Sequence, residues 1–98
     1  MVIKVLGPGC EACDLLAEVV RRAVLMMGME ATLLKVREPA EYRRYGLLFT
    51  PGLVINEKLV CGGRIPSLEE VSTWLADAAM AEYEQKSASP SSQGSDGR

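Results

Sequence analysis

Two cysteines separated by two residues, Cys10 and Cys13, are the side chains of this sequence best suited to chemistry. Thiol-disulfide exchange needs an attacking thiolate and a second thiol close enough to resolve the mixed disulfide, and this spacing provides both. The same spacing also suits a soft metal ion such as Cu(I) or Zn²⁺. The pair by itself therefore leaves two kinds of chemistry open, redox exchange and metal binding.

The cysteine pair lies between a predicted strand and a predicted helix. Residues 2–6 form a short run with β-branched side chains, and the Gly-Pro-Gly that follows is typical of a tight loop. Apolar residues then recur at helical spacing over residues 15–27. The positive end of a helix dipole favours a thiolate on Cys10, with Cys13 one turn deeper. We therefore predict that Cys10 is the nucleophile and Cys13 the resolving thiol.

Two carboxylates flank the pair. Glu11 lies between the cysteines and Asp14 follows the second one. Like charge opposes ionisation, so we expect Cys10 to be less acidic than the helix dipole alone would make it. This pattern predicts a reducing couple rather than a strongly oxidising one.

The rest of the chain alternates strand and helix patterns. Residues 31–36 have strand character, and the strand, helix, strand order predicts a right-handed crossover between parallel strands. Pro39 suits the first position of a short helix over residues 40–45. Two further short strands, residues 53–55 and 58–61, surround Asn56 and Glu57 and predict a hairpin. The sequence therefore belongs to the α/β class.

A last helix is expected from Ser67 onward. Ser67 and Glu70 have the spacing of a capping box, and apolar residues follow at helical spacing until the helix should fray over residues 82–85. Beyond it the composition turns to serine and glycine, which offer nothing to bury. We predict one domain over residues 1–84 and a disordered tail over residues 85–98.

Composition excludes several classes of function. The chain has 98 residues, a formal net charge of -2 and no histidine. It therefore has no basic footprint for nucleic acid and no imidazole for cysteine-histidine catalysis. The first apolar run is too short for a signal peptide or a membrane span. We expect a cytoplasmic protein with no nucleic-acid or membrane partner.

The order of elements separates redox exchange from metal carriage. A ferredoxin-like metal carrier runs βαββαβ, whereas this chain is expected to run βαβαββα. Three features accompany that order, namely the Cys10 and Cys13 pair, Thr50-Pro51 before the third strand, and the run Gly-Gly-Arg-Ile-Pro-Ser over residues 62–67. With these features the sequence resembles the thioredoxin-like superfamily, and within it the small, glutaredoxin-sized redox-active disulfide proteins, over about residues 1–84.

The resemblance implies a three-layer αβα fold with a four-stranded mixed sheet in the order 2-1-3-4. It also implies that Pro51 is cis and lies against the active-site disulfide. We assign substrate binding to Thr50, Pro51, Gly9 and Gly63. No cofactor or metal is expected. The partners implied are disulfide-bearing proteins and a reductase or low-molecular-weight thiol. We expect the chain itself to be a monomer.

Two other classes of function stay open at this stage. Thr50-Pro51 with Arg43 or Arg44 could imitate a glutaredoxin's glutathione site, although two adjacent arginines more simply form a solvated helix face. The cysteines could instead serve a non-enzymatic module that binds metal or a partner. Cys61 is interpreted as a packed free cysteine, with a third redox or metal-ligating thiol as the alternative.

Overall fold

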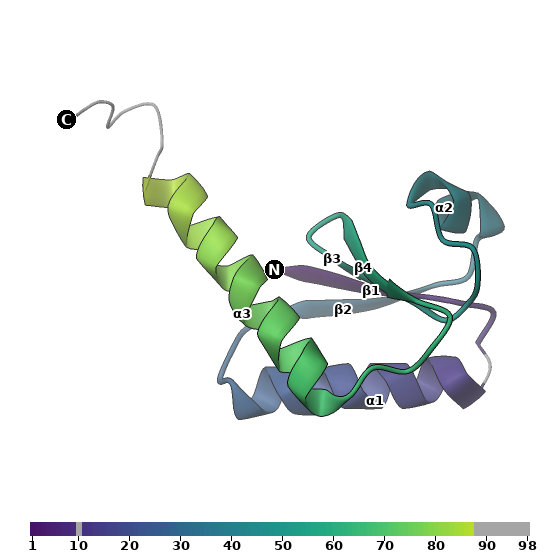
Figure 1. Cartoon of the computed structure of the whole chain (residues 1–98), viewed down its shortest axis with the longest axis horizontal. Coiled ribbons are helices and arrows are strands. Elements are labelled where there is room, and N and C mark those ends of the chain that lie inside the picture. Colours follow the sequence, from purple (N-terminus) through teal and green to yellow (C-terminus); the bar gives the residue numbers. More distant parts are fainter. Residues whose placement is uncertain (10, 88–98) are drawn as a thin grey trace.

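The computed structural model describes residues 1–9 and 11–87, and within them the helices and strands follow the expected βαβαββα order (Figure 1). They are β1 (Val2–Leu6), α1 (Glu11–Met26), β2 (Thr32–Val36), α2 (Pro39–Arg44), β3 (Gly52–Ile55), β4 (Lys58–Gly62) and α3 (Leu68–Ser87).

The four strands form one mixed sheet in the order β2-β1-β3-β4, as predicted. β1 and β2 are parallel because α1 carries the chain back across the sheet between them. β3 runs antiparallel to both β1 and β4. The inner strand β1 therefore runs toward the end of the sheet at which α1 begins.

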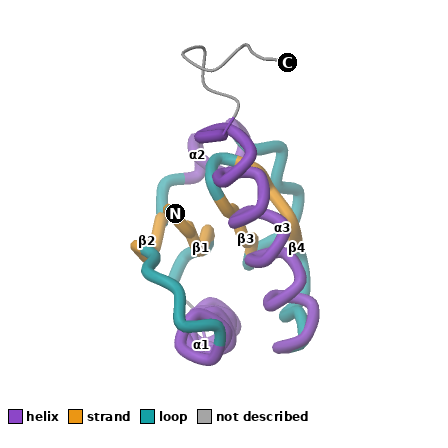
Figure 2. Tube along the Cα trace, turned by 90° about the vertical axis from the view of Figure 1, so that its left-hand side faces the viewer, coloured by secondary structure: helices purple, strands orange, loops and turns teal. Residues whose placement is uncertain are grey.

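The two faces of the sheet carry different helices (Figure 2). Ile3 and Val5 of β1 pack with α1 and α3 in the larger apolar cluster, whereas Leu6 packs on the other face with Tyr42 of α2. Side chains alternate between the faces of a strand, so one short strand serves both clusters. One helix thus covers one face and two cover the other, which confirms the three-layer arrangement.

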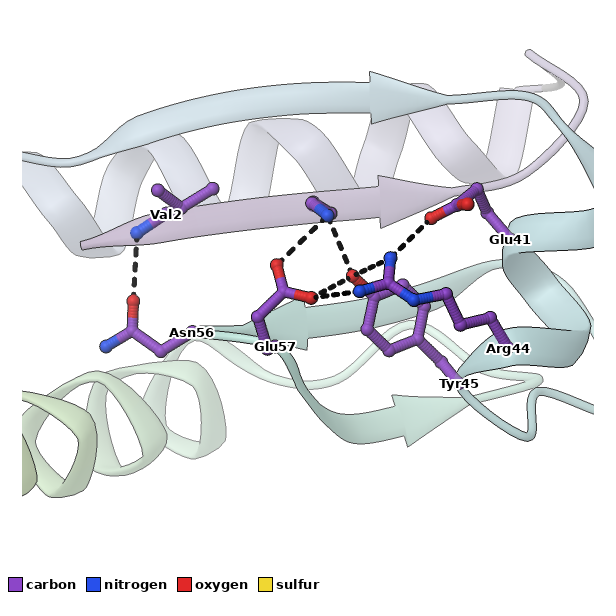
Figure 3. Close-up of polar contacts among 7 residues, drawn as sticks. Val2, Glu41, Arg44, Tyr45, Asn56 and Glu57 are labelled. Carbon is purple, nitrogen blue, oxygen red and sulfur yellow. Dashed lines mark hydrogen bonds and ion pairs between the residues drawn. The ribbon is translucent and has the colours of Figure 1, made fainter.

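The β3–β4 hairpin turns at Asn56 and Glu57, as predicted. Both residues have positive φ, 50° and 68°, which is the backbone of a primed two-residue turn. The Asn56 side chain also accepts a hydrogen bond from the backbone N–H of Val2 at 3.0 Å (Figure 3). Asparagine tolerates this backbone region, while glutamate has no intrinsic preference for it.

Glu57 is held by a polar network on the α2 side of the sheet (Figure 3). Its carboxylate accepts from the Tyr45 hydroxyl at 2.6 Å and from Arg44 at 3.1 Å, and it pairs with Lys4 at 3.0 Å. Hydrogen bonds lower the pKa of Glu57; the bond from Tyr45 has the larger effect and the bond from Lys4 the next. These contacts join the end of α2 to the turn of the hairpin.

The capping box at the start of α3 is confirmed. The backbone N–H of Glu70 donates to the Ser67 hydroxyl at 3.1 Å, and the N–H of Ser67 donates to the Glu70 carboxylate at 2.9 Å. Hydrogen bonds from Arg64 and then from the Ser67 backbone lower the pKa of Glu70 to about 2. Local sequence therefore specifies where this helix begins.

The end of α3 differs from the expectation. The helix continues to Ser87, past the fraying predicted over residues 82–85 and past the predicted domain boundary at residue 84. Alanine, glutamate, glutamine and lysine dominate its last two turns, and their helix propensities support continuation after the apolar face ends. The remainder of the expected tail, residues 88–98, lies outside the described residues. No helix in the described part has the length and apolar character to span a membrane.

Candidate active site

Cys13 lies in the first turns of α1 with its side chain buried and only 3% exposed. Its Sγ faces Gly7, where a Cβ would lie 2.1 Å from the sulfur and 3.9 Å from the Cα of Pro51. The backbone N–H of Gly7 in turn donates to the carbonyl of Val36 on β2 at 3.0 Å. The end of β1, the start of α1 and the loop before β3 therefore meet at the Cys13 sulfur. Cys10 itself lies outside the described residues.

The Thr50-Pro51 peptide bond is cis. Pro51 is buried while Thr50 is exposed, and the Pro51 carbonyl accepts a hydrogen bond from the N–H of Gly63 at 2.9 Å. Gly63 has a φ of +79°, a conformation that glycine adopts without steric cost. The structure thus brings Gly63 to Pro51, and Pro51 to the same Gly7 position as Cys13, while the roles of Thr50, Pro51 and Gly63 in binding substrate stay predictions.

The loop before Pro51 is anchored by Leu47, which is 8% exposed. A Cβ on Gly52 would lie 2.7 Å from one Leu47 methyl carbon, and a Cβ on Gly62 would lie 2.6 Å from the other. These two glycines face each other across β3 and β4. Gly52 and Gly62, which are paired across the two strands and lack side chains, therefore leave the space that Leu47 fills.

Replacing Leu47 by alanine is expected to lower the free energy of unfolding by about 2 to 4 kcal/mol, the usual cost of truncating a buried leucine. Leu48 is the matched control because it is the next residue and is 86% exposed. Its replacement by alanine should change stability by less than about 0.5 kcal/mol. Urea unfolding of the two variants compares them directly. Equal losses would show that Leu47 does not anchor this loop.

Exposed apolar side chains border the site. Phe49 is 73% exposed, and its Cβ lies 3.2 Å from the position a Gly63 Cβ would take. Leu48 and Ile65, on the same two loops, are also exposed. The loops that carry Pro51 and Gly63 therefore also expose apolar side chains.

The carboxylates that flank the cysteine pair have different surroundings. Lys35 of β2 pairs with Asp14 at 3.1 Å, whereas Glu11 has no ion pair with another described residue. Both members of the Lys35 pair are exposed, so the contact adds little to stability. The pair does place the Lys35 cation beside Asp14, one of the two carboxylates from which the reducing couple was predicted.

Sequence reasoning missed three residues of this region. They are Leu47, Phe49 and Arg37, whose guanidinium lies against Gly9, and the sequence analysis assigned none of them a role. The glycines at positions 52 and 62 were the available signal for Leu47. Nothing local could have pointed to Arg37, because its contact joins segments 28 residues apart.

The remaining candidates are a third cysteine, which belongs to the same buried cluster as Cys13, and the arginines of α2. Cys61 on β4 is 8% exposed, and its thiol lies 3.9 Å from the carbonyl oxygen of Arg64. Arg44 belongs to the network with Glu41 and Glu57 on the α2 side of the sheet. Within residues 1–9 and 11–87, no three side chains of the kinds that bind metal gather into a cluster.

A mixed sheet of this topology, with Cys13 in the helix that follows β1 and a cis-proline at the start of β3, defines the class of thioredoxin-fold proteins. The structure of thioredoxin 1 from Thermosipho africanus superposes on it with a TM-score of 0.52 and 19% identity, over 85% of this chain and 99% of that one. This likeness supports the fold.

Sequence comparison identifies the family. The family described as "Thioredoxin domain" matches residues 1–76. A thioredoxin of Methanocaldococcus jannaschii is 35% identical over 72% of this chain and 81% of its own length. One of Methanothermobacter thermautotrophicus is 34% identical over 78% of this chain and 99% of its own. The chain belongs to the thioredoxin family and is a thiol-disulfide oxidoreductase; a glutaredoxin activity is not favoured.

Proposed function

We propose that this chain reduces disulfide bonds in other proteins, with Cys10 as the attacking thiol and Cys13 as the resolving thiol. The observation that carries the proposal is the buried position of Cys13 against Gly7 and near Pro51, one helical turn after Cys10 in the sequence. A resolving thiol must reach the mixed disulfide yet stay away from solvent and competing disulfides. The site around Cys13 supports both requirements.

The exchange proceeds in two balanced steps. The Cys10 thiolate attacks one sulfur of the substrate disulfide, forming a mixed disulfide and releasing the other sulfur as a thiolate, which takes up a proton. Cys13 then loses its proton and attacks the Cys10 sulfur, which releases the second substrate thiol and leaves an oxidised Cys10 and Cys13 pair. The substrate gains two electrons and two protons, and a reductase or low-molecular-weight thiol must return them to the enzyme.

The neighbouring backbone supports binding of an extended substrate segment. We assign this role to Thr50, Pro51, Gly9 and Gly63, with the exposed ring of Phe49 providing apolar contact beside them. Such a site favours unfolded or loop segments of proteins, because folded surfaces present few extended chains. The proposed setting is the cytoplasm, where thiols are kept reduced, and the proposed working form is a monomer.

A redox titration followed by mass spectrometry tests the proposal. The purified chain is equilibrated in glutathione buffers of known potential, alkylated and digested. We expect a two-electron couple confined to Cys10 and Cys13, with a midpoint near about -270 mV, the range of thioredoxins.

Three outcomes of this titration contradict the proposal. A midpoint near about -120 mV would indicate an oxidant instead. A glutathione adduct on Cys10 without an intramolecular bond would support a glutathione-linked activity. Metal that stays bound to the cysteines under native conditions would support a metal carrier.

A further inference from the structure

A cavity of about 500 Å³ lies between α3 and the β3–β4 hairpin. Its volume falls within the range of roughly 300 to 1,000 Å³ that is typical of small-molecule sites. α3 lies on the β3 and β4 side of the sheet and α1 on the β1 side (Figure 2). The cavity is found where the second half of α3 passes the hairpin. The apolar part of its wall consists of Ile55, Val60, Trp74, Ala78 and Ala81.

A β-bulge in β4 helps to shape the strand side of this cavity. Leu53 pairs with Cys61 and Val54 pairs with Leu59, so Val60 has no partner on β3. An extra residue of this kind interrupts the alternation of side chains, and both Val60 and Cys61 pack on the face that α1 and α3 cover. Cys61 is buried in the core, whereas Val60 lies at its border and lines the cavity.

Two carboxylates and one ammonium group line the cavity. Glu82 already accepts a hydrogen bond from the Asn56 amide and lies 3.7 Å from the amino group of Met1. Asp77 on α3 and Lys58 on β4 make no hydrogen bond or ion pair with another described residue. Their charges are therefore available to a bound molecule.

Trp74 and Asp77 form an aromatic and acidic corner of the cavity. They are three residues apart on α3, which makes them neighbours on the helix surface, and both line the cavity. The face of an indole ring attracts a cation, and a carboxylate beside it adds direct charge attraction. Between residues 68 and 85 the helix carries five carboxylates and neither lysine nor arginine. The helix side of the cavity is therefore suited to a positive charge.

We propose that this cavity binds a small organic cation, an amine or guanidinium compound whose carbon skeleton fills the apolar part. Its charged group lies against Trp74 and Asp77, and its apolar body contacts Ile55 and Val60. Lys58, on the strand side, opposes a cation and would favour an anion. The two unpaired charges therefore predict opposite effects when each is removed, which makes the sign of the ligand's charge testable.

The cavity lies at the opposite end of the sheet from Cys13. Asn56, in the hairpin turn, bonds to the backbone of Val2 at the start of β1, whereas Gly7 and Cys13 meet beyond its end. No described residue that we assign to disulfide exchange lines the cavity. Binding of a cation here therefore does not depend on the thiol chemistry.

Three probes that share a phenethyl group test the preference for positive charge. At neutral pH phenethylamine is a cation, phenethyl alcohol is neutral and hydrocinnamate is an anion. Trp74 is the only tryptophan of the chain, so its fluorescence reports binding at this site. Shifts of backbone amide signals in NMR spectra locate the site independently. We expect phenethylamine to bind the full-length chain about threefold to tenfold more tightly than the alcohol, and hydrocinnamate to bind most weakly.

Charge variants test the two unpaired residues. Asp77→Asn keeps the size of an exposed side chain and should weaken phenethylamine about threefold to fivefold, with no effect on the alcohol. Lys58→Gln should tighten phenethylamine about twofold. Glu69→Gln is the matched control, because it removes an exposed carboxylate that lies eight residues, or about 12 Å, before Asp77 on the same helix and does not line the cavity. It should leave the affinity unchanged.

The outcomes separate support from contradiction. A preference for phenethylamine that Asp77→Asn removes and Glu69→Gln retains supports the proposal. Equal binding of the three probes, or a preference for hydrocinnamate that Lys58→Gln removes, overturns it. Amide shifts centred on Pro51 and Gly63, or no shifts in α3 and the hairpin at up to about 20 mM phenethylamine, overturn it as well.

Insulin reduction distinguishes this site from the proposed function. The rate should be the same with and without saturating phenethylamine, and the same in Asp77→Asn as in the original chain. A chain that binds the amine but reduces no disulfide would defeat the proposed function alone. A chain that reduces insulin but shows no charge preference would defeat only the cation site.

Discussion

Replacing Cys10 by serine is expected to reduce insulin-disulfide reduction to the rate of the buffer alone. Of the three cysteines, Cys13 is 3% exposed and Cys61 is 8% exposed, so neither sulfur can approach a disulfide on another protein without rearrangement. This agrees with the proposal that Cys10 is the attacking thiol. A serine hydroxyl stays protonated at neutral pH and forms no mixed disulfide, so the first step is lost.

Cys61→Ser is the control for this experiment. It removes a buried thiol from β4 and should leave the rate of insulin reduction within about twofold of the original, even if it lowers stability by about 1 kcal/mol. The turbidity of precipitating insulin B chain, measured with dithiothreitol as the electron source, reports both rates. Equal turnover by the Cys10→Ser variant and the original chain would refute the mechanism. A large loss of insulin reduction in Cys61→Ser alone would show that Cys61 on β4 is the reactive thiol.

Replacing Gly7 by alanine is expected to slow insulin reduction by about 10- to 100-fold, although Cys10 and Cys13, the proposed reactive pair, are unchanged. The added methyl would lie 2.1 Å from the Cys13 sulfur, far inside van der Waals contact. Either the sulfur or the loop must move, and the resolving step depends on the position of that sulfur. Overpacking of this kind should also lower the free energy of unfolding by about 1 to 3 kcal/mol.

A double-mutant cycle separates this clash from a general defect in the loop. In a Cys13→Ala background the sulfur is absent, so Gly7→Ala should cost much less stability than it does in the original chain. Gly28→Ala controls for a loss of stability alone: its φ of +64° strains an alanine, but no atom lies within 4 Å of a Cβ there, so its rate of insulin reduction should stay near the original. Full activity in Gly7→Ala, or an equal stability cost in both backgrounds, would show that the two residues do not depend on each other.

Much of the fold could be predicted from local sequence, for reasons visible in particular residues. The helical spacing of apolar residues after Asp14 predicts α1, and Ser67 with Glu70 predicts the start of α3 through a capping box that the structure contains. The turn at Asn56 and Glu57 was predicted from its length, although glutamate is a poor residue for its backbone. The end of α3 was placed too early, since loss of the apolar face does not stop residues with high helix propensity.

The sequence by itself thus determined the order of strands and helices and the place of a Cys-x-x-Cys segment at the start of a helix. These depend on residues that are close along the chain. Only the tertiary structure decided that Leu47 sits between Gly52 and Gly62, and that Arg37 lies on Gly9. Both contacts arise from the register of paired strands and the direction of side chains across them. That geometry is set by the packing of the whole sheet against its helices, so no local pattern contains it.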